Sequence, residues 1–444
     1  MRSTRPLLVL AVVFGGLLAY LYFVDAKKPV TPEGVETRDK VFGVEADTIE
    51  ALEIVSSTGE TSTLVKEKDE WQLKQPFATR ADESEISGIT SNLASLEIQG
   101  VVDESPKDLQ PYGLAEPRVR IAFKSSGSTE RRLAIGDKTP TGGDLYARRD
   151  GEPRVFLIPS YLDTTFDRKP FDLRDKSVLR FDRDKVDRLE LAGSGPGVEA
   201  VKTGLDWMLT SPIKARADYS AVEGLVTRLQ SAQMKSVVTE SPSPADLQKY
   251  GLDRPVATAA VGAGSSRATL AFGKATPEND VYARDASGSL VVTMARDLLD
   301  EVQRAAPDLR RKDVFEFRPF NAGRLEITRG AETFAFEKAK GSGTDTAEKW
   351  RQTAPKAADV DTAKFDTLLS KLTALRAQSF ADKAPGTAPV LAVAARFDEG
   401  KKSEQVRFER TGEDVLAVRS DEAGAARVST SEFEEALSAL DALK

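Results

Sequence analysis

The chain repeats one pattern of residues three times, and this internal repeat limits the folds it can adopt. A Trp is followed by a Pro five residues later and by an Asp eleven residues later, and a helical apolar pattern follows each Asp. The three sets are Trp71, Pro76 and Asp82; Trp207, Pro212 and Asp218; and Trp350, Pro355 and Asp361. Their spacing, about 140 residues, is far above that of solenoid repeats and close to the size of a domain. The sequence therefore predicts three copies of one domain.

The repeat sets the predicted domain boundaries. We expect repeat domain 1 over residues 45–176, repeat domain 2 over 177–312 and repeat domain 3 over 313–444. The first two copies share a Tyr-Gly-Leu segment, at Tyr112 and Tyr250, whereas the third copy lacks it. The connectors between copies repeat as well and are not rich in Gly or Ser, which favours a fixed relation between neighbouring copies.

Each copy shows the patterns of strands and of one buried helical face. In the first copy, Val119, Ile121 and Phe123 alternate with polar residues, as in antiparallel strands with one buried face. After Asp82, apolar residues recur at steps of three and four from Ile86, as on a helix. The predicted fold class is α+β: an N-terminal transmembrane helix followed by three tandem domains, each a mainly antiparallel sheet with one or two packed helices.

The N-terminus carries the strongest prediction of location. Leu7 to Val24 is an uncharged and mostly apolar run, preceded by Arg2 and Arg5. This length can span a bilayer, and it exceeds the apolar region of a cleaved signal peptide. We therefore expect a transmembrane anchor over 1–24 and a tether over 25–44, with a cleaved signal peptide and a buried core helix as alternatives. The predicted localisation is a single-pass protein of the inner (cytoplasmic) membrane, N-terminus inside and the bulk of the chain periplasmic or extracellular.

Two missing residue types restrict the chemistry. The chain has no His and no Cys, which excludes catalytic triads built on either, imidazole or thiolate metal sites and disulfides. The net charge is −7 without a basic stripe, so nucleic acid is not an expected partner. We predict no cofactor, no metal and no catalytic residue.

The repeated residues have structural explanations beside functional ones. Each Asp is expected to cap a helix, and Glu85 three places after Asp82 suggests a capping box; a ligand or catalytic carboxylate is the alternative. Each Trp is expected in the core, with an exposed binding platform as the alternative. Each Pro is expected to end a strand. Tyr146 and Tyr282, in repeated Tyr-Ala-Arg segments, are possible binding aromatics.

Together these motifs resemble an uncharacterised bacterial domain-of-unknown-function family. The resemblance rests on Trp-x4-Pro-x5-Asp, Tyr-Gly-Leu before Pro, Ile-Gly or Phe-Gly before Thr-Pro, and Tyr-Ala-Arg, and it covers Ala46 to about Phe317 well and the third copy partly. It implies a membrane helix with repeated units, and genes that often lie beside those of gliding-motility-type ABC transporters. No catalytic residue follows from it.

The expected function is non-enzymatic: a membrane-anchored envelope protein acting as an accessory or scaffold subunit, with such a transporter complex as the expected assembly. Envelope proteins are the expected partners. The alternative is a module that binds cell-wall glycan or a small ligand through Tyr146, Tyr282 or a Trp. A hydrolase that uses only carboxylates is a third possibility.

Overall fold

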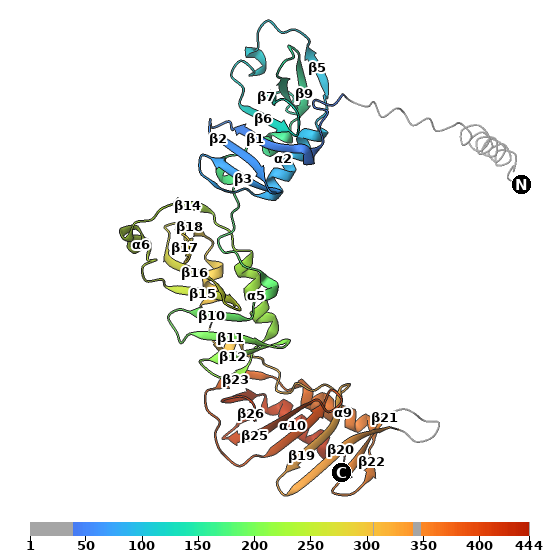
Figure 1. Cartoon of the computed structure of the whole chain (residues 1–444). Helices are drawn as coiled ribbons and strands as arrows, with labels where there is room; N and C mark the ends of the chain where they lie inside the picture. Colours follow the sequence, from blue (N-terminus) through green and yellow to red (C-terminus); the bar gives the residue numbers. More distant parts are fainter. Residues whose placement is uncertain (1–38, 305, 341–347, 444) are drawn as a thin grey trace, which may run out of the picture. The chain divides into compact units, whose positions relative to one another are not determined.

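We describe the chain from a computed structural model, which covers residues 39–304, 306–340 and 348–443 (Figure 1). The chain divides into two compact units, one ending at Asp175 and the other beginning at Lys176. The first unit contains one antiparallel sheet, and the second contains two. Each of these three sheets has nine strands in the described residues, and each draws its strands from one sequence repeat.

In the first repeat the sheet order is β4-β3-β2-β1-β6-β7-β8-β9-β5. Its elements are η2 (Ala46–Thr48), β1 (Ile49–Val55), β2 (Thr61–Glu67), β3 (Glu70–Gln75), β4 (Thr79–Arg80), α2 (Glu83–Ser95), β5 (Gly100–Asp103), η3 (Gln110–Tyr112), β6 (Val119–Ser125), β7 (Arg131–Lys138), β8 (Asp144–Arg149), β9 (Val155–Pro159), α3 (Leu162–Phe166) and α4 (Pro170–Leu173).

The second repeat has the same order, β13-β12-β11-β10-β15-β16-β17-β18-β14. Its elements are η4 (Arg183–Lys185), β10 (Arg188–Ala192), β11 (Val198–Thr203), β12 (Asp206–Ser211), β13 (Ala215–Arg216), α5 (Tyr219–Gln230), β14 (Ser236–Thr239), α6 (Pro244–Tyr250), β15 (Ala257–Ala263), β16 (Ser266–Ala275), β17 (Val281–Asp285), β18 (Val291–Met294), α7 (Asp297–Val302) and α8 (Ala306–Leu309).

The third repeat keeps this order as β22-β21-β20-β19-β24-β25-β26-β27-β23. Its elements are β19 (Ala322–Arg329), β20 (Glu332–Lys340), β21 (Glu348–Ala354), β22 (Ala358–Asp359), α9 (Thr362–Ala374), β23 (Ala377–Ala381), β24 (Leu391–Phe397), β25 (Lys402–Thr411), β26 (Asp414–Arg419), β27 (Ala425–Val428) and α10 (Thr430–Asp441). The shared order confirms the predicted repeat.

One strand pair joins the two halves of each sheet. In the first repeat this pair is β1 and β6, which places Leu52 beside Phe123 and Ile54 beside Ile121. Because successive side chains of a strand point to opposite faces, these residues share one face and leave Glu53 on the other. The buried side chains of the first face form a core with Ile86 of α2 and with residues of α3 and α4. The helices of this repeat therefore pack against one face of its sheet.

The helices that follow the repeated Asp residues carry the predicted apolar face. The buried residues of α2 are Ile86, Ile89, Thr90 and Leu93, those of α5 are Val222, Leu225, Val226 and Leu229, and those of α9 are Phe365, Leu368, Leu369 and Leu372. In the third repeat, α9 also packs against α10 beside the sheet (Figure 1). The helical periodicity read from the sequence is thus confirmed.

The predicted fold class needs correction. The described chain consists mainly of three continuous nine-stranded antiparallel sheets, and its longest helices, α2 and α9, have 13 residues. In the first and third repeats, the strands of the wide sheet supply most of the buried apolar residues of the core. The helix that begins after the repeated Asp supplies part of the remainder. The class is sheet-dominated rather than the predicted α+β with a transmembrane helix.

The membrane prediction is corrected with it. Within the described residues no helix is both long and apolar enough to cross a bilayer. The predicted anchor over 1–24, and the tether as far as residue 38, lie outside the described residues. The inner-membrane localisation that depended on that helix is therefore withdrawn.

Candidate functional site

The repeated Asp residues lie at the N-caps of three helices. Asp82 accepts hydrogen bonds from the backbone N–H groups of Ser84 and Glu85, at 3.0 and 3.2 Å. Asp218 and Asp361 each accept one bond from the third residue after them, at 3.0 and 3.1 Å. Their carboxylates satisfy donors that the first turn of a helix leaves unpaired. This structural task accounts for the recurrence of Asp.

The capping box suggested by Glu85 is wrong. The Glu85 side chain forms an ion pair with Arg168, at 2.8 Å, instead of returning to the cap. The neighbouring Glu83 accepts a hydrogen bond from the backbone N–H of Trp71, at 2.7 Å. A partner from a distant part of the chain therefore takes the carboxylate that the local pattern assigns to the cap.

The repeated Trp residues are buried, with Trp71, Trp207 and Trp350 between 1% and 6% exposed. The three Pro residues of the motif, Pro76, Pro212 and Pro355, all follow cis peptide bonds.

The indole N–H of Trp207 donates to Glu223 at 2.9 Å, and Lys202 and Arg183 pair with the same carboxylate. Burial alone would raise the pKa of Glu223, but the hydrogen bonds from Trp207 and Lys202 outweigh it and lower the pKa.

Tyr146 and Tyr282 contact the Tyr of the Tyr-Gly-Leu segment in their own repeat. The ring centroids of Tyr112 and Tyr146 lie 5.2 Å apart, and those of Tyr250 and Tyr282 lie 4.6 Å apart. Tyr146 and Tyr282 are half-buried. The two motifs, separate in sequence, therefore form one packing unit in each of the first two repeats.

A glycine in β7 of the first repeat, and its counterpart in β16 of the second, leaves room for this unit. A Cβ atom on Gly136 would lie 2.1 Å from the carbonyl oxygen of Tyr112, and one on Gly273 would lie 2.2 Å from that of Tyr250. No side chain fits at such a distance. The glycines of the Tyr-Gly-Leu segments have positive φ angles, 64° at Gly113 and 72° at Gly251.

The third repeat lacks both the Tyr-Gly-Leu turn and the glycine that lies against it in the other two repeats. Strand register places Glu409 of β25 where the first two repeats have Gly136 and Gly273. Glu409 is 1% exposed and accepts a hydrogen bond from the backbone N–H of Thr387, at 3.0 Å. A side chain therefore occupies the space that the turn fills in the other copies.

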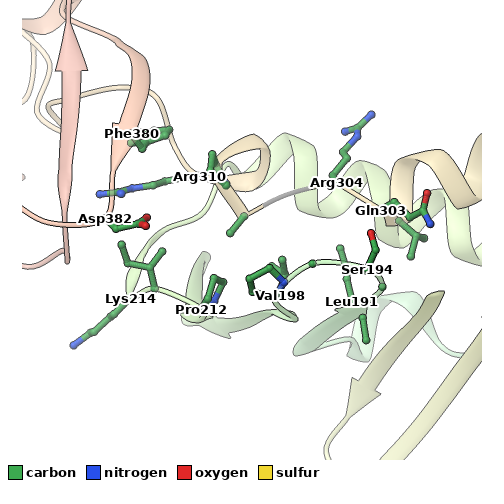
Figure 2. Close-up of a pocket in the computed structure, with 18 of the residues that line it drawn as sticks. Leu191, Ser194, Val198, Pro212, Lys214, Gln303, Arg304, Arg310, Phe380 and Asp382 are labelled. Atoms are coloured by element: carbon green, nitrogen blue, oxygen red, sulfur yellow. The ribbon is translucent and has the colours of Figure 1, made fainter. Parts of the chain in front are cut away.

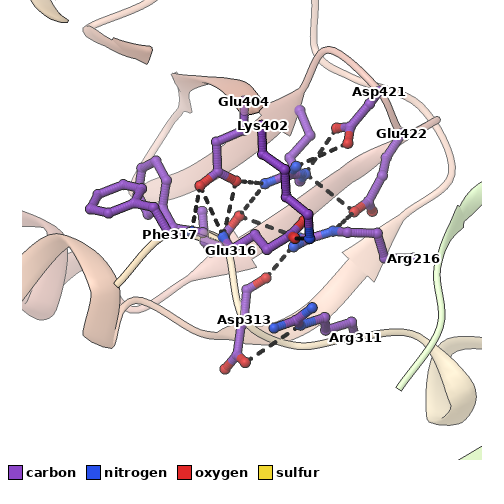
Figure 3. A network of polar contacts seen from close by, with 12 residues as sticks. Arg216, Arg311, Asp313, Glu316, Phe317, Lys402, Glu404, Asp421 and Glu422 are labelled. Atoms are coloured by element: carbon purple, nitrogen blue, oxygen red, sulfur yellow. Dashed lines mark hydrogen bonds and ion pairs between the residues drawn. The ribbon is translucent and has the colours of Figure 1, made fainter. Parts of the chain in front are cut away.

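Buried charges join the second and third repeats, which lie in the same compact unit (Figure 3). Arg216 of β13 and Arg310 of the connector both bind the carboxylate of Glu422, which follows β26. The Arg310 pair measures 2.8 Å, and the Glu422 side chain is 3% exposed. Burial, followed by repulsion from Arg419, lowers the pKa of Arg216, although Glu422 opposes this shift.

A second set of bonds secures the start of the third repeat. Glu404 of β25 accepts hydrogen bonds from the backbone N–H groups of Glu316 and Phe317, at 2.8 to 3.0 Å. It also pairs with Arg419, which binds Asp421 at 2.9 Å. The loop after β26 is thus fixed from both sides, because the backbone N–H of Ala423 donates to the backbone carbonyl oxygen of Lys214 in the second repeat, at 2.8 Å.

A cavity of about 710 Å³ opens beside this joint (Figure 2). Apolar side chains line most of it, from the second repeat and from Phe380 of the third: Leu191, Val198, Pro212, Ile213, Val302, Pro307 and Phe380. Ser194, Lys214, Gln303, Arg304 and Asp382 supply polar groups around them. We call this space the junction cavity.

In the first repeat, the residues at the positions of Ser194 and Gln303 are bonded to each other. There the hydroxyl and the backbone N–H of Ser57 donate to Asp167, at 2.6 and 2.8 Å. The second repeat has Ser194 and Gln303 at these places, and no hydrogen bond joins the two side chains among the described contacts. The carboxylate that bridges these positions in the first repeat is therefore absent beside the junction cavity.

A stacked arginine shows the same exchange. In the first repeat the guanidinium of Arg174 lies over the ring of Phe77, 4.7 Å from its centroid. In the second repeat Ile213 replaces Phe77, and the guanidinium of Arg310 lies over Phe380 of the third repeat, at 4.4 Å. The third repeat thus completes a contact that the first repeat makes alone.

Sequence reasoning missed the junction, since none of the predicted marker residues except Pro212 lines the cavity. The signal available in the sequence was the difference between the first two repeats at two positions, Phe77 against Ile213 and Asp167 against Gln303. In the described chain, no group of three or more Asp and Glu residues is arranged to hold a metal ion. The cavity geometry supports binding of an apolar group with polar contacts at its rim.

Comparisons with known proteins give a family but no function. No curated protein matches the chain. Two solved structures of the sliding clamp from Pseudomonas aeruginosa are similar at 7% and 8% identity: a DNA polymerase sliding clamp with ligand, and a DnaN sliding clamp (DNA polymerase III subunit beta) bound to griselimycin. They cover 87% and 88% of this chain and 93% of each clamp, with TM-scores of 0.17 and 0.16, too low to support any argument.

The family comparison is more extensive. Residues 71–205 and 207–392, well over half of the chain, match the family described as Domain of unknown function (DUF4340). The two matches adjoin within the second repeat, beside Trp207. The expected resemblance to an uncharacterised domain family is confirmed at this level, and the chain belongs to the DUF4340 family.

Proposed function

We propose that this protein is a non-enzymatic accessory or scaffold protein that holds a segment of a partner protein in the junction cavity. The observation that carries the proposal is a large, mostly apolar cavity between two repeats that buried charges lock together. Such a preformed site binds without a further ordering cost in the protein. The resemblance noted from the sequence makes a gliding-motility-type ABC transporter complex the candidate partner.

The rigidity of the joint supports this role. Glu422 and Arg310 are almost fully buried, and removal of Glu422 would leave the charge of Arg310 without its carboxylate partner. The second and third repeats are therefore expected to keep their relative position when a partner binds. A scaffold needs this property, because it must present its binding surfaces at fixed positions.

The lining supports a protein partner. Apolar walls with polar groups at the rim are typical of pockets that receive one anchoring side chain from a partner. Lys214 and Arg304 have no ion-pair partner among the described residues and are exposed at the rim. They are available to polar groups that flank the anchoring residue.

The test compares partner recovery by two variants of the tagged full-length protein. In Figure 2 the Ser194 side chain rises from its loop toward the Gln303 side of the cavity. Ser194→Trp is expected to fill the cavity, whereas Ser194→Ala leaves it open. We expect mass spectrometry of the purified complexes to show a stoichiometric protein with wild type and Ser194→Ala, lost with Ser194→Trp.

A second closing variant guards against misfolding. Gln303→Asp introduces the carboxylate that Asp167 supplies in the first repeat, so it is expected to bridge to Ser194 and reduce binding in the same way. Equal recovery by wild type, Ser194→Trp and Gln303→Asp, all with unchanged melting temperature, would contradict the proposed site.

A second candidate function, binding of a small ligand or cell-wall glycan fragment, is favoured by the volume of the cavity, which lies in the range of small-molecule sites. Tyr146 and Tyr282 give it less support, since each packs against a Tyr of its own repeat. A rise in melting temperature with peptidoglycan fragments, abolished by Ser194→Trp, would favour this function over the scaffold.

A further inference from the structure

The first repeat carries a basic hollow on the sheet face opposite its helices. The hollow has a volume of about 430 Å³ and lies over β1, β6, β7 and β8. Its charged lining consists of four arginines and two acids: Arg120, Arg132, Arg148, Arg149, Glu53 and Asp150. The whole chain has a net charge of −7, so this concentration of positive charge is local.

Strand register arranges the arginines in a spaced pattern with alanines between them. One row across the strands reads Val55, Arg120, Ala134 and Arg148. The next row reads Glu53, Ala122 and Arg132. Because neighbouring strands lie about 4.8 Å apart, the backbones of Arg120 and Arg148 are separated by about 10 Å. The small alanines leave the space between the arginine side chains open.

The arginines differ in how far they are already engaged. Arg120 is exposed and has no hydrogen-bond or ion-pair partner among the described residues. Arg132 pairs with Glu130 at the exposed end of the strand, at 2.6 Å, and Arg148 donates to the carbonyl oxygen of Glu152 at 3.0 Å. Arg149 is bound to Glu152 and to the carbonyl oxygen of Val41. Arg120 is thus the group most available to a new partner, and the exposed Arg132 on the adjacent strand would exchange its contact with Glu130 for one with the partner.

The other repeats keep the frame of this surface without two of its arginines. At the register position of Arg120 the second repeat has Thr258 and the third has Ala392. At that of Arg132 they have Thr269 and Gln405. The acid is common to all three, as Glu53, Glu190 and Glu326, and so is the adjacent alanine. The two arginines are therefore an addition specific to the first repeat, unnecessary for the fold.

We propose that this hollow binds an extended acidic segment of a partner protein. Side chains on one side of an extended segment repeat about every 7 Å, which lets successive carboxylates reach arginines on neighbouring strands. A single phosphate would instead need donors converging on one point, and here they are spread over three strands. Guanidinium groups suit carboxylates because they donate two parallel hydrogen bonds. This binding is independent of the junction cavity.

The test measures binding of a fluorescent peptide of alternating Glu and Ser to the full-length protein. Arg120→Thr with Arg132→Thr installs the residues that the second repeat carries at the same register. We expect the double variant to weaken binding about tenfold and to reduce its salt dependence. The matched control, Arg188→Thr with Arg267→Thr, removes the same charge from the second repeat, where both arginines are paired with Glu. It is expected to have no effect.

The reverse exchange gives a second, positive readout. Thr258→Arg with Thr269→Arg is expected to create a new acidic-peptide site in the second repeat, doubling the bound peptide at saturation. Equal weakening by both arginine-removing variants would overturn the proposal, since it would show only an effect of net charge. So would tighter binding of single-stranded DNA than of the acidic peptide to the wild type. Retained binding of the peptide by the Ser194→Trp variant would show that this site is distinct from the junction cavity.

Discussion

At Gly136 and Gly273 the backbone of a strand lies so close to the backbone of the Tyr-Gly-Leu turn that a single added carbon atom would not fit between them. Each lies against the carbonyl oxygen of a Tyr in the preceding turn, and each is buried. In the third repeat, where the turn is missing, Glu409 stands at this position. The choice between no side chain and a long one therefore follows from whether the Tyr-Gly-Leu turn is present.

Gly136→Ala is expected to destabilise the protein by about 1 to 3 kcal/mol, because the added Cβ would lie 2.1 Å from the Tyr112 carbonyl oxygen and force the turn to move. Urea unfolding followed by fluorescence measures the loss. Gly143→Ala is the control, since no atom lies within 4 Å of its Cβ position. Similar midpoints for the two variants would show that the turn yields without cost.

Asp82 gives a second prediction at this scale. Asp82→Ala is expected to cost about 1 kcal/mol of unfolding free energy, because two backbone donors lose their acceptor, whereas Asp82→Asn is expected to be mild. Chemical denaturation of both variants provides the measurement. Loss of partner binding at unchanged stability would contradict the capping role and restore Asp82 as a functional residue.

At the scale of elements, features that depend on a local sequence pattern can be predicted, whereas features that depend on contacts between distant parts of the chain cannot. The apolar spacing after Asp82 predicts α2, because a helix buries one face at fixed intervals. The fate of Glu85 could not be predicted, since its partner Arg168 lies far along the chain. Strand β5 escaped detection for a similar reason: its only strand partner in the described sheet, β9, lies more than fifty residues later.

The junction shows the same limit. Arg216 resembles Arg80 of the first repeat in sequence, yet Arg80 pairs with Glu70 in its own sheet and is exposed. Arg216 instead reaches Glu422, more than two hundred residues away. Only the packing of two repeats brings these charges together, so alignment of the repeats shows that the residues correspond but not that their contacts differ.

Glu422→Gln tests the junction directly. It removes the charge that compensates Arg216 and Arg310, both less than 10% exposed, and is expected to cost on the order of 3 kcal/mol. Calorimetry of the full-length protein measures the loss. Glu399→Gln serves as control, because its partner Lys401 and the carboxylate itself are largely exposed, and it is expected to change little. Equal melting temperatures for the two variants would show that the junction charges contribute nothing.

At the scale of the whole molecule, the charges that surround the junction make the second compact unit sensitive to acid. Burial would raise the pKa of Asp421, but hydrogen bonds from Arg419 outweigh it and lower the pKa. The pKa of Glu316 is lowered in the same way. Burial would raise it, but the hydrogen bond from Lys402 at the surface outweighs burial. Both carboxyls therefore hold their charge in the folded protein to lower pH than in the unfolded chain.

The sign of the pH effect follows from these two shifts. A carboxyl whose pKa is lower in the folded state contributes its full stabilisation above its unfolded pKa, which is about 4, and loses it as the pH falls toward the folded value. We expect the melting temperature of the unit from Lys176 onward to fall progressively below about pH 5. Asp421→Asn is expected to melt lower than wild type at pH 7 and to lose less on acidification, so that the two curves converge near pH 3. Scanning calorimetry between pH 7 and 3 gives both curves, and parallel curves would show that Asp421 does not couple this unit to pH.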